Sequence, residues 1–158
     1  LDDTAAAKFP FISVDMYQRL VKPFHKAVAD LALNHGLKIS MHCCGKCESF
    51  IDDWIDIGVS AWEPAQAAND LIGIKQKYGR KMAIMGGWDN LNHASQPDAS
   101  EEELVEELKK YVDTFAPNGG FAFNASVQGD HTSEDFKKRM EVVNRVYEEY
   151  AKPWYKNH

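Results

Sequence analysis

Two hydrophobic periods alternate along this chain. Short runs in which apolar residues cluster or alternate predict β-strands, and longer segments in which they recur every three or four residues predict helices. The expected strands are 37–41, 59–62, 82–85 and 121–124. The expected helices are 15–35, 50–57, 70–78, 100–115 and 133–150. Because each strand is followed by a helix, the sequence predicts an α/β protein with about four βα units.

The first predicted helix, from Asp15 to His35, carries a long apolar stripe. Its members recur at three- and four-residue steps, so we expect the stripe to be buried. The residues are Met16, Leu20, Val21, Phe24, Val28, Leu31 and Ala32. Pro23 lies inside the segment and is expected to kink the helix, because proline lacks the backbone N–H that the helical ladder uses.

The repeated order of strand and helix constrains the topology. Short connections that return the chain to the same edge require parallel strands, which occur in a closed barrel or an open sheet. The even repeats favour a TIM (β/α)8 barrel, as does the concentration of Gly, Asp, Glu, His and Cys after strands. A complete barrel takes about 250 residues. With 158 residues, the chain is expected to be a single partial domain, residues 1–158, forming the C-terminal half of such a barrel.

Half of a barrel needs a partner to close it. The partner is expected to be the N-terminal half of the same barrel or a second copy of this chain. The segment Leu1-Asp2-Asp3 has the composition of the end of an earlier strand, which favours the first alternative.

The stretch Met41–Cys47 holds all three cysteines and one histidine, directly after a predicted strand. His42 and Cys44 project from the same face of an extended segment, so both can reach one metal ion. Cys47 completes a CxxC motif with Cys44, which adds a second sulfur ligand or forms a redox pair. Catalytic zinc takes three protein ligands and keeps an open position. The motif predicts such a zinc site with His42, Cys44 and Cys47, the alternative being structural cysteines without a metal.

Composition is typical of a globular protein and argues against nucleic-acid-binding and membrane-spanning classes. The chain is 44% hydrophobic and 27% charged, with a net charge of −6, as in ordinary globular proteins. The acidic balance and the scattered basic residues argue against nucleic-acid binding. No apolar stretch approaches the roughly 20 residues that span a bilayer, and the acidic N-terminus lacks a signal-peptide pattern. Three clustered cysteines do not form a secreted disulfide framework, so we expect a cytoplasmic protein.

Several short motifs, taken in order, resemble a known family. They are Asp2-Asp3, Phe11-Ile12-Ser13, Met16-Tyr17, Pro23, His42-Cys43-Cys44-Gly45, Asp53, Ile57-Gly58-Val59, 75–79, Gly86-Gly87-Trp88-Asp89 and Gly119-Gly120-Phe121. Their order and spacing resemble the C-terminal half of the uroporphyrinogen decarboxylase superfamily, which contains porphyrinogen decarboxylases and corrinoid-dependent methyltransferases. The His-x-Cys-Gly motif resembles the methyltransferase branch, whose members use this His and Cys as zinc ligands.

The resemblance implies a zinc-assisted, corrinoid-dependent methyltransferase that handles methyl groups of small substrates, with the corrinoid on a partner protein. His42 and Cys44 would then be zinc ligands. Thiol-methylating members take a further cysteine from the loop after the last strand, where this chain has Val127. Glu63 and Asp89 are the preferred replacements and catalytic candidates, because each follows a predicted strand and can converge on the barrel mouth.

Further residues at strand ends are expected to contact a cofactor. Trp62 and Trp88 can stack on a flat macrocycle, the alternative being buried aromatic rings that close a layer of the barrel. Gly86 and Gly87 share the Gly-Gly-Trp-Asp motif of the resemblance with Trp88, Asn124 belongs to a Phe-Asn pair like that of the decarboxylases, and all three are assigned the same role.

Two other functions stay open at this point. The first is a carboxy-lyase of the uroporphyrinogen decarboxylase type, which needs no cofactor, although Val127 also replaces the histidine that decarboxylases place after a pair like Phe123-Asn124. The second is a non-catalytic half-barrel that binds a metal or a tetrapyrrole. Loss of the last family ligand, replaced here by Val127, is expected in such a protein.

Overall fold

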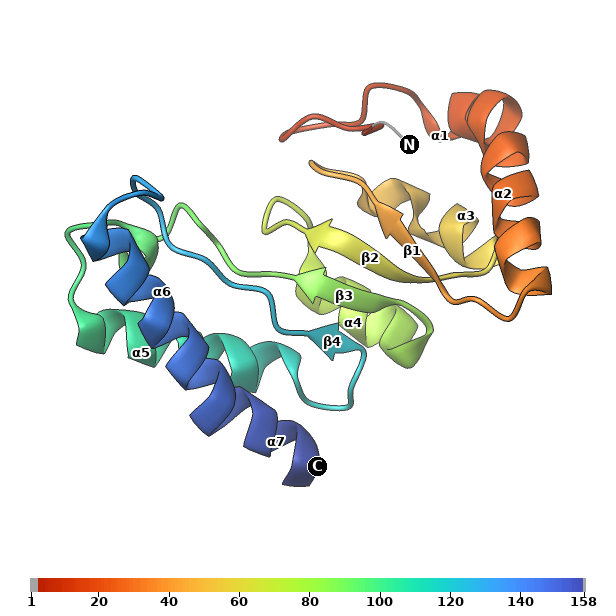
Figure 1. The fold of residues 1–158 in the computed structure, drawn as a ribbon. Helices are drawn as coiled ribbons and strands as arrows, with labels where there is room; N and C mark the ends of the chain where they lie inside the picture. The colour runs from red at the N-terminus through yellow and green to blue at the C-terminus, as the bar shows by residue number, and fades with distance from the viewer. Residues whose placement is uncertain (1–2, 158) are drawn as a thin grey trace.

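A single sheet of four parallel strands organises the protein in the computed structural model, which describes residues 3–157 (Figure 1). The strands are β1 (Ile39–His42), β2 (Val59–Ala65), β3 (Ala83–Gly86) and β4 (Phe121–Ala122). They lie in the order β1-β2-β3-β4, and each pairs in parallel with the next along the chain. The predicted strands are confirmed, with shifts of a few residues at their ends.

Helical segments precede β1 and follow every strand. Those before β1 are α1 (Val14–Met16), η1 (Tyr17–Val21) and α2 (Lys22–Asn34). Those between the strands are η2 (Glu48–Phe50), α3 (Ile51–Asp56), α4 (Leu71–Tyr78), η3 (Gly79–Lys81), η4 (His93–Ser95) and α5 (Glu101–Phe115). After β4 come α6 (Glu134–Val146), η5 (Tyr147–Ala151) and α7 (Lys152–Asn157). Helix α5 begins with the predicted capping box, in which Ser100 and Glu103 exchange side chain to backbone hydrogen bonds.

The two faces of the sheet have different surroundings. One row of register partners runs across all four strands and is buried under the helices. The row consists of Met41, Trp62, Ile84 and Phe121. Alternate residues point to the opposite face, where Ser40 is exposed and its neighbours Ala61 and Ala83 are half-buried. Helices therefore cover one face of the sheet and leave the other open.

Consecutive strand order with helices on one face is the topology of a barrel. An open doubly wound sheet reverses its strand order and carries helices on both faces. A TIM barrel closes with eight βα units, and the sheet formed within residues 3–157 has four strands. The fold is α/β and forms half of a TIM barrel, as the sequence predicts. Within residues 3–157, no helix combines the length and the apolar character needed to cross a membrane.

The N-terminal helical segment departs from the prediction. A π-helical turn, η1, comes before α2, and Pro23 lies in the first turn of α2, where its missing N–H costs no hydrogen bond. The expected burial of the apolar stripe is wrong for five of its residues, which are 45–72% exposed. These are Met16, Leu20, Phe24, Val28 and Leu31. The segment instead buries Tyr17, His25 and Ala29, because β1 is the last strand on this side and nothing described packs outside α2.

The buried histidine of α2 makes the stability of the fold sensitive to acid. His25 Nδ1 lies 2.9 Å from the buried Tyr17 hydroxyl. Burial lowers the pKa of His25 below its ordinary value, so the folded chain holds a neutral imidazole. The unfolded chain takes up a proton at about pH 6.5, while the folded chain does so only at lower pH. This contribution to stability is therefore present above about pH 6.5 and is lost as the pH falls through the lowered pKa.

We expect the urea midpoint of the metal-free protein to fall between about pH 7.5 and about pH 5.5. In His25→Gln, the midpoint should be lower at both values but should change less between them, because the titrating group is gone. An equal acid-induced fall in the two proteins would show that His25 is not the source.

Candidate functional site

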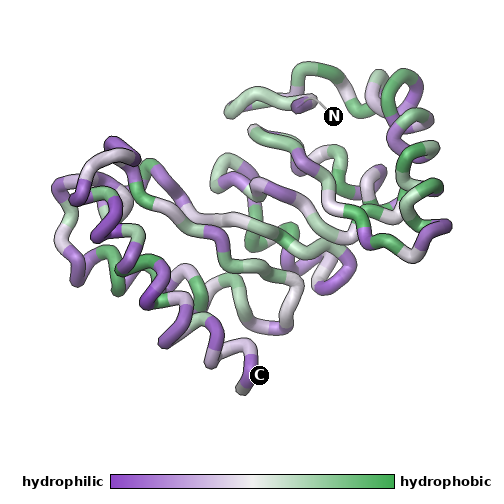
Figure 2. Tube along the Cα trace, viewed as in Figure 1, coloured by the Kyte–Doolittle hydropathy of each residue, from purple (hydrophilic) through white to green (hydrophobic). Residues whose placement is uncertain are grey.

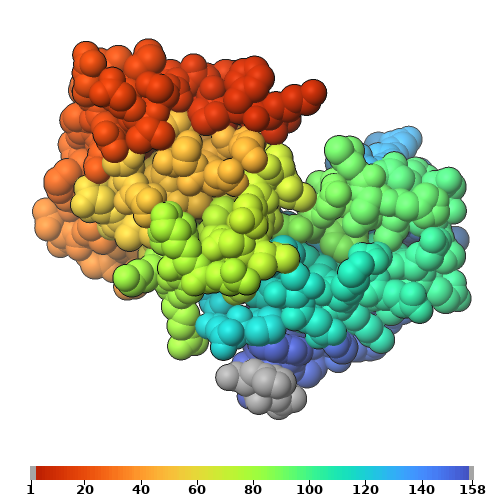
Figure 3. Space-filling view, turned by 180° about the vertical axis from the view of Figure 1, so that it is seen from behind, coloured from red at the N-terminus to blue at the C-terminus, as the bar shows by residue number. Residues whose placement is uncertain are grey.

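Three potential metal ligands meet at the carboxyl end of β1. His42 is the last residue of β1, and Cys44 follows two positions later. The N-terminal segment packs against this region, and in Figure 3 its red residues lie along the top of the molecule against orange ones. The Lys46 N–H donates to the carbonyl of Ala6 at 2.9 Å, and the Cys44 N–H donates to Asp3 Oδ1 at 2.7 Å. These contacts place the Asp3 carboxylate beside His42 and Cys44.

The geometry of the three residues fits a zinc ion. Their ligand atoms lie within 4.8 Å of one another, and within residues 3–157 no other group of His, Cys, Asp and Glu is so arranged. Cys44 Sγ is 3.9 Å from His42 Nε2, which is 4.0 Å from Asp3 Oδ1. In a tetrahedral zinc shell, these pairs of atoms lie about 3.4–3.6 Å apart, so a contraction of about half an ångström brings each of these two pairs to the spacing of zinc ligands. The His42 side chain is 58% exposed, which leaves room for a further ligand.

The thiol of Cys44 is protonated in the absence of a cation. Burial, and then the charge and hydrogen bond of Asp3, raise the pKa of Cys44 above its ordinary value. A divalent cation between the two groups reverses this preference, because it stabilises a thiolate and a carboxylate together. Metal binding at this position should therefore release a proton.

Cys47, the third predicted ligand, is not brought to this group. Its side chain is completely buried, and its Sγ donates to the carbonyls of Cys43 and Gly45 at 3.5 Å. A hydrogen bond between the two thiols, followed by burial, raises the pKa of Cys47, while the same thiol-to-thiol bond lowers the pKa of Cys43. Cys47 is thus a buried thiol of the core, whereas Cys44 is only half-buried.

The two predicted catalytic carboxylates have different positions. Glu63 is the register partner of His42 on β2, so its half-buried side chain comes from the neighbouring strand on the same open face. Asp89 is exposed in the turn after β3, and its Oδ1 accepts the N–H of Leu91 at 2.9 Å. Neither residue belongs to the group of three ligands, although Glu63 lies one strand away from it.

The two predicted stacking residues are engaged in the core. Trp62 is completely buried, packs 6.0 Å from Trp54 between ring centroids, and donates its indole N–H to the Cys43 carbonyl at 2.9 Å. Trp88 is 8% exposed and donates to the carbonyl of Ser126 at 2.7 Å. Neither ring has an open face at the barrel mouth in this structure. Trp62 instead fixes the backbone next to Cys44.

The predicted glycines shape the end of β3. Gly86 has a positive φ of 134°, and a Cβ there would lie 2.9 Å from the backbone nitrogen of Ala65. Gly87 donates its N–H to the Ala65 carbonyl at 2.6 Å. Asn124 follows β4 with an exposed side chain, and its N–H donates to the Tyr111 hydroxyl at 3.2 Å. The glycines therefore allow close approach of β2 and β3, and Asn124 is the one of the three with a side chain open to a ligand.

Val127 and Asp2 are two further positions that the sequence motifs single out. Val127, at the place of the family cysteine, is 3% exposed and packs in the core. Asp2 lies outside the described residues, whereas its neighbour Asp3 supplies the third group of the site. Sequence reasoning missed Asn69, whose side chain bonds the loop after β1, because a polar residue just before a helix is common to many turns.

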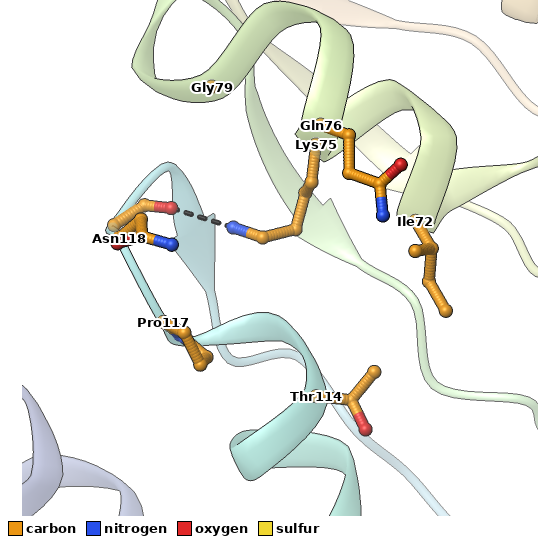
Figure 4. Close-up of a pocket in the computed structure, with 8 residues that line it drawn as sticks. Ile72, Lys75, Gln76, Gly79, Thr114, Pro117 and Asn118 are labelled. Carbon is orange, nitrogen blue, oxygen red and sulfur yellow. Dashed lines mark hydrogen bonds between the residues drawn. The ribbon is translucent and has the colours of Figure 1, made fainter.

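A cavity of about 200 Å³ lies away from these groups, between α4 and the turn from α5 to β4 (Figure 4). Lys75 reaches across it and donates to the carbonyl of Gly119 at 2.7 Å. This turn precedes β4 and therefore lies at the amino ends of the strands. The candidate site is an open surface at the opposite, carboxyl ends of the strands.

The fold and the ligand group define an α/β half-barrel with a candidate metal centre at the carboxyl ends of its strands. Residues 3–148 match the sequence profile described as uroporphyrinogen decarboxylase (URO-D). The chain belongs to this family. A search of curated protein sequences finds no match.

The fold is also similar to that of a solved methyltransferase from Methanosarcina mazei. The TM-score is 0.60 at 15% sequence identity, and the match covers 92% of this chain and 41% of that chain. At this identity the likeness shows a shared fold. The chain therefore spans less than half the length of that methyltransferase.

Proposed function

We propose that this chain supplies part of the active site of a zinc-dependent methyltransferase. The observation that carries the proposal is the convergence of Asp3, His42 and Cys44 at the carboxyl end of β1, where barrel active sites are built. Membership of the URO-D family and the fold of the M. mazei methyltransferase support the class. The His-x-Cys-Gly motif favours the methyltransferase branch of the family.

The three side chains suit this chemistry. When bound, zinc supplies a Lewis acid that keeps a coordinated substrate thiol as thiolate at neutral pH, which is the nucleophile for methyl transfer. Asp3 and Cys44 provide two negative charges, which balance the dication, and His42 contributes a neutral nitrogen. The exposed edge of His42 leaves the position at which a substrate sulfur would enter.

The donor in this proposal is a methylated corrinoid carried by a partner protein, and the acceptor is a small thiol. The remaining strands of the barrel come from an N-terminal half or from a second copy of the chain. Such a half would also cover the open face of the sheet beside His42 and Glu63.

Methyl transfer from methylcobalamin to small thiols tests the proposal. We expect zinc-dependent loss of the methyl–cobalt absorbance and formation of the methylated thiol. His42→Ala should reduce the rate to that of zinc and thiol without protein, because a metal ligand is lost. His35→Ala is the matched control and should keep the wild-type rate, since His35 is an exposed residue at the end of α2.

Other outcomes would favour the alternatives. Zinc-free decarboxylation of a porphyrinogen would point to the carboxy-lyase reaction for which the family is named. Tight zinc binding without methyl transfer to any thiol would indicate a metal-binding half-barrel without catalysis.

A further inference from the structure

The loop that carries Cys44 is held by a side chain from the next βα unit. Asn69 lies between β2 and α4 and is 7% exposed. Its Oδ1 accepts the backbone N–H groups of Cys47 at 2.9 Å and Glu48 at 3.0 Å. Its Nδ2 donates to the carbonyls of Gly45 at 2.9 Å and Gln66 at 3.0 Å. An asparagine amide has two donor hydrogens and two acceptor sites, so this buried side chain is fully satisfied.

A second side chain from the same connection between β2 and α4 holds the loop. Gln66 accepts the N–H of Gly45 at 2.7 Å through its Oε1. Gly45, the residue after Cys44, is thereby fixed at both its N–H and its carbonyl. Its φ of +83° and the approach of Ala6, whose carbonyl oxygen lies 2.5 Å from the place of a Cβ, require a glycine at this turn.

The residue before Cys44 is fixed by β2. The Cys43 N–H donates to the carbonyl of Glu63 at 2.8 Å, and the Cys43 carbonyl accepts the Trp62 indole N–H at 2.9 Å. Cys44 is therefore held between one neighbour tied to β2 and another tied to Asn69 and Gln66. Its own backbone contact is with Asp3, another of the potential ligands.

We propose that Asn69 is a positioning residue for the metal centre, and that its amide sets the distance between the Cys44 sulfur and the His42 imidazole. This inference rests on the metal centre proposed above. A loop without the amide samples positions in which the two ligand atoms are too far apart to share an ion. The conformational entropy that is lost when metal binding orders this loop then weakens the affinity.

Metal affinity in two variants tests the role of Asn69. We expect Asn69→Ala to weaken Zn²⁺ and Co²⁺ binding by about 10- to 100-fold, the range typical for residues that orient metal ligands. The stoichiometry at saturation and the thiolate-to-cobalt charge-transfer band should remain, because all three ligands are intact. Gln66→Ala removes only the bond to the Gly45 N–H, and its side chain is exposed, so we expect a smaller loss in a chain that folds normally.

Asn92→Ala is the matched control. It also removes a loop amide, one that accepts the N–H and hydroxyl of Ser95 in the connection after β3. Its metal affinity should equal that of the wild type. The urea midpoint of each metal-free variant is measured in parallel, because a purely structural residue lowers the midpoint without changing the affinity of the folded chain.

The results separate this inference from the proposed function. Wild-type affinity in both folded Asn69→Ala and Gln66→Ala would overturn the positioning role and leave the metal centre standing. A wild-type chain that binds neither Zn²⁺ nor Co²⁺ would overturn the metal centre, and the role of Asn69 with it.

Discussion

Protein purified without an affinity tag should contain about one zinc ion per chain, and Cys44→Ser should contain almost none. Sulfur is the strongest zinc ligand among the three groups, and a serine hydroxyl stays protonated at neutral pH. Elemental mass spectrometry of the two proteins, normalised to protein concentration, measures the difference directly.

Cys47→Ser provides the matched control, because it makes the same sulfur-to-oxygen change three residues away. We expect it to retain zinc, since Cys47 is completely buried and its thiol bonds backbone carbonyls of the loop. Asp3→Asn should bind zinc more weakly than the wild type, because a neutral amide replaces a carboxylate. Zinc retained in Cys44→Ser but lost in Cys47→Ser would contradict the geometry and restore the CxxC thiol as the ligand.

The chain should self-associate at micromolar concentration through the apolar face of α1, η1 and α2. Figure 2 shows green hydrophobic residues alternating with purple ones along this segment, and the exposed residues of this face are 45–72% accessible to solvent. They are Met16, Leu20, Phe24, Val28 and Leu31. A contiguous apolar surface of this kind is rare on monomers and marks a contact site. Sedimentation equilibrium should show a mass above that of the 17.9 kDa chain, increasing with concentration.

A double substitution on this face should shift the chain towards the monomer. Phe24→Glu with Leu31→Glu places two charges seven residues apart on the same side of α2, where they oppose removal of the surface from water. Leu91→Glu is the control, because Leu91 is 86% exposed in the turn after β3 and lies outside the stripe. A monodisperse wild-type monomer would show that the stripe is tolerated in water without a partner.

The main elements and the ligand pair were predictable from the sequence for local reasons. The alternation of apolar residues in β1 and the three- and four-residue steps in α5 reflect how a strand or a helix presents its side chains, and this geometry involves only near neighbours. The capping box at Ser100 is equally local. His42 and Cys44 are two residues apart at a strand end, so their common direction also follows from the sequence.

The buried face of α2 and the position of the Cys47 thiol depended instead on tertiary packing. The same periodicity in α2 did not identify its buried face, because burial requires a neighbouring element, and β1 is the last strand on that side. Cys47 fits the CxxC spacing as well as Cys44 does, and only packing sends its thiol into the core.

Residues distant in the sequence complete the site. Asp3 accepts a hydrogen bond from Cys44, 41 positions away in the sequence, and Asn69 donates one to Gly45, 24 positions away. The sequence by itself determined which segments become strands and helices, their order, and the His42 and Cys44 pair. The tertiary structure decided the third ligand, the burial of the Cys47 thiol, the hydrogen bonds of Asn69 to the loop and the exposed face of α2. These features depend on contacts between segments that are distant in the sequence, and local spacing does not encode such contacts.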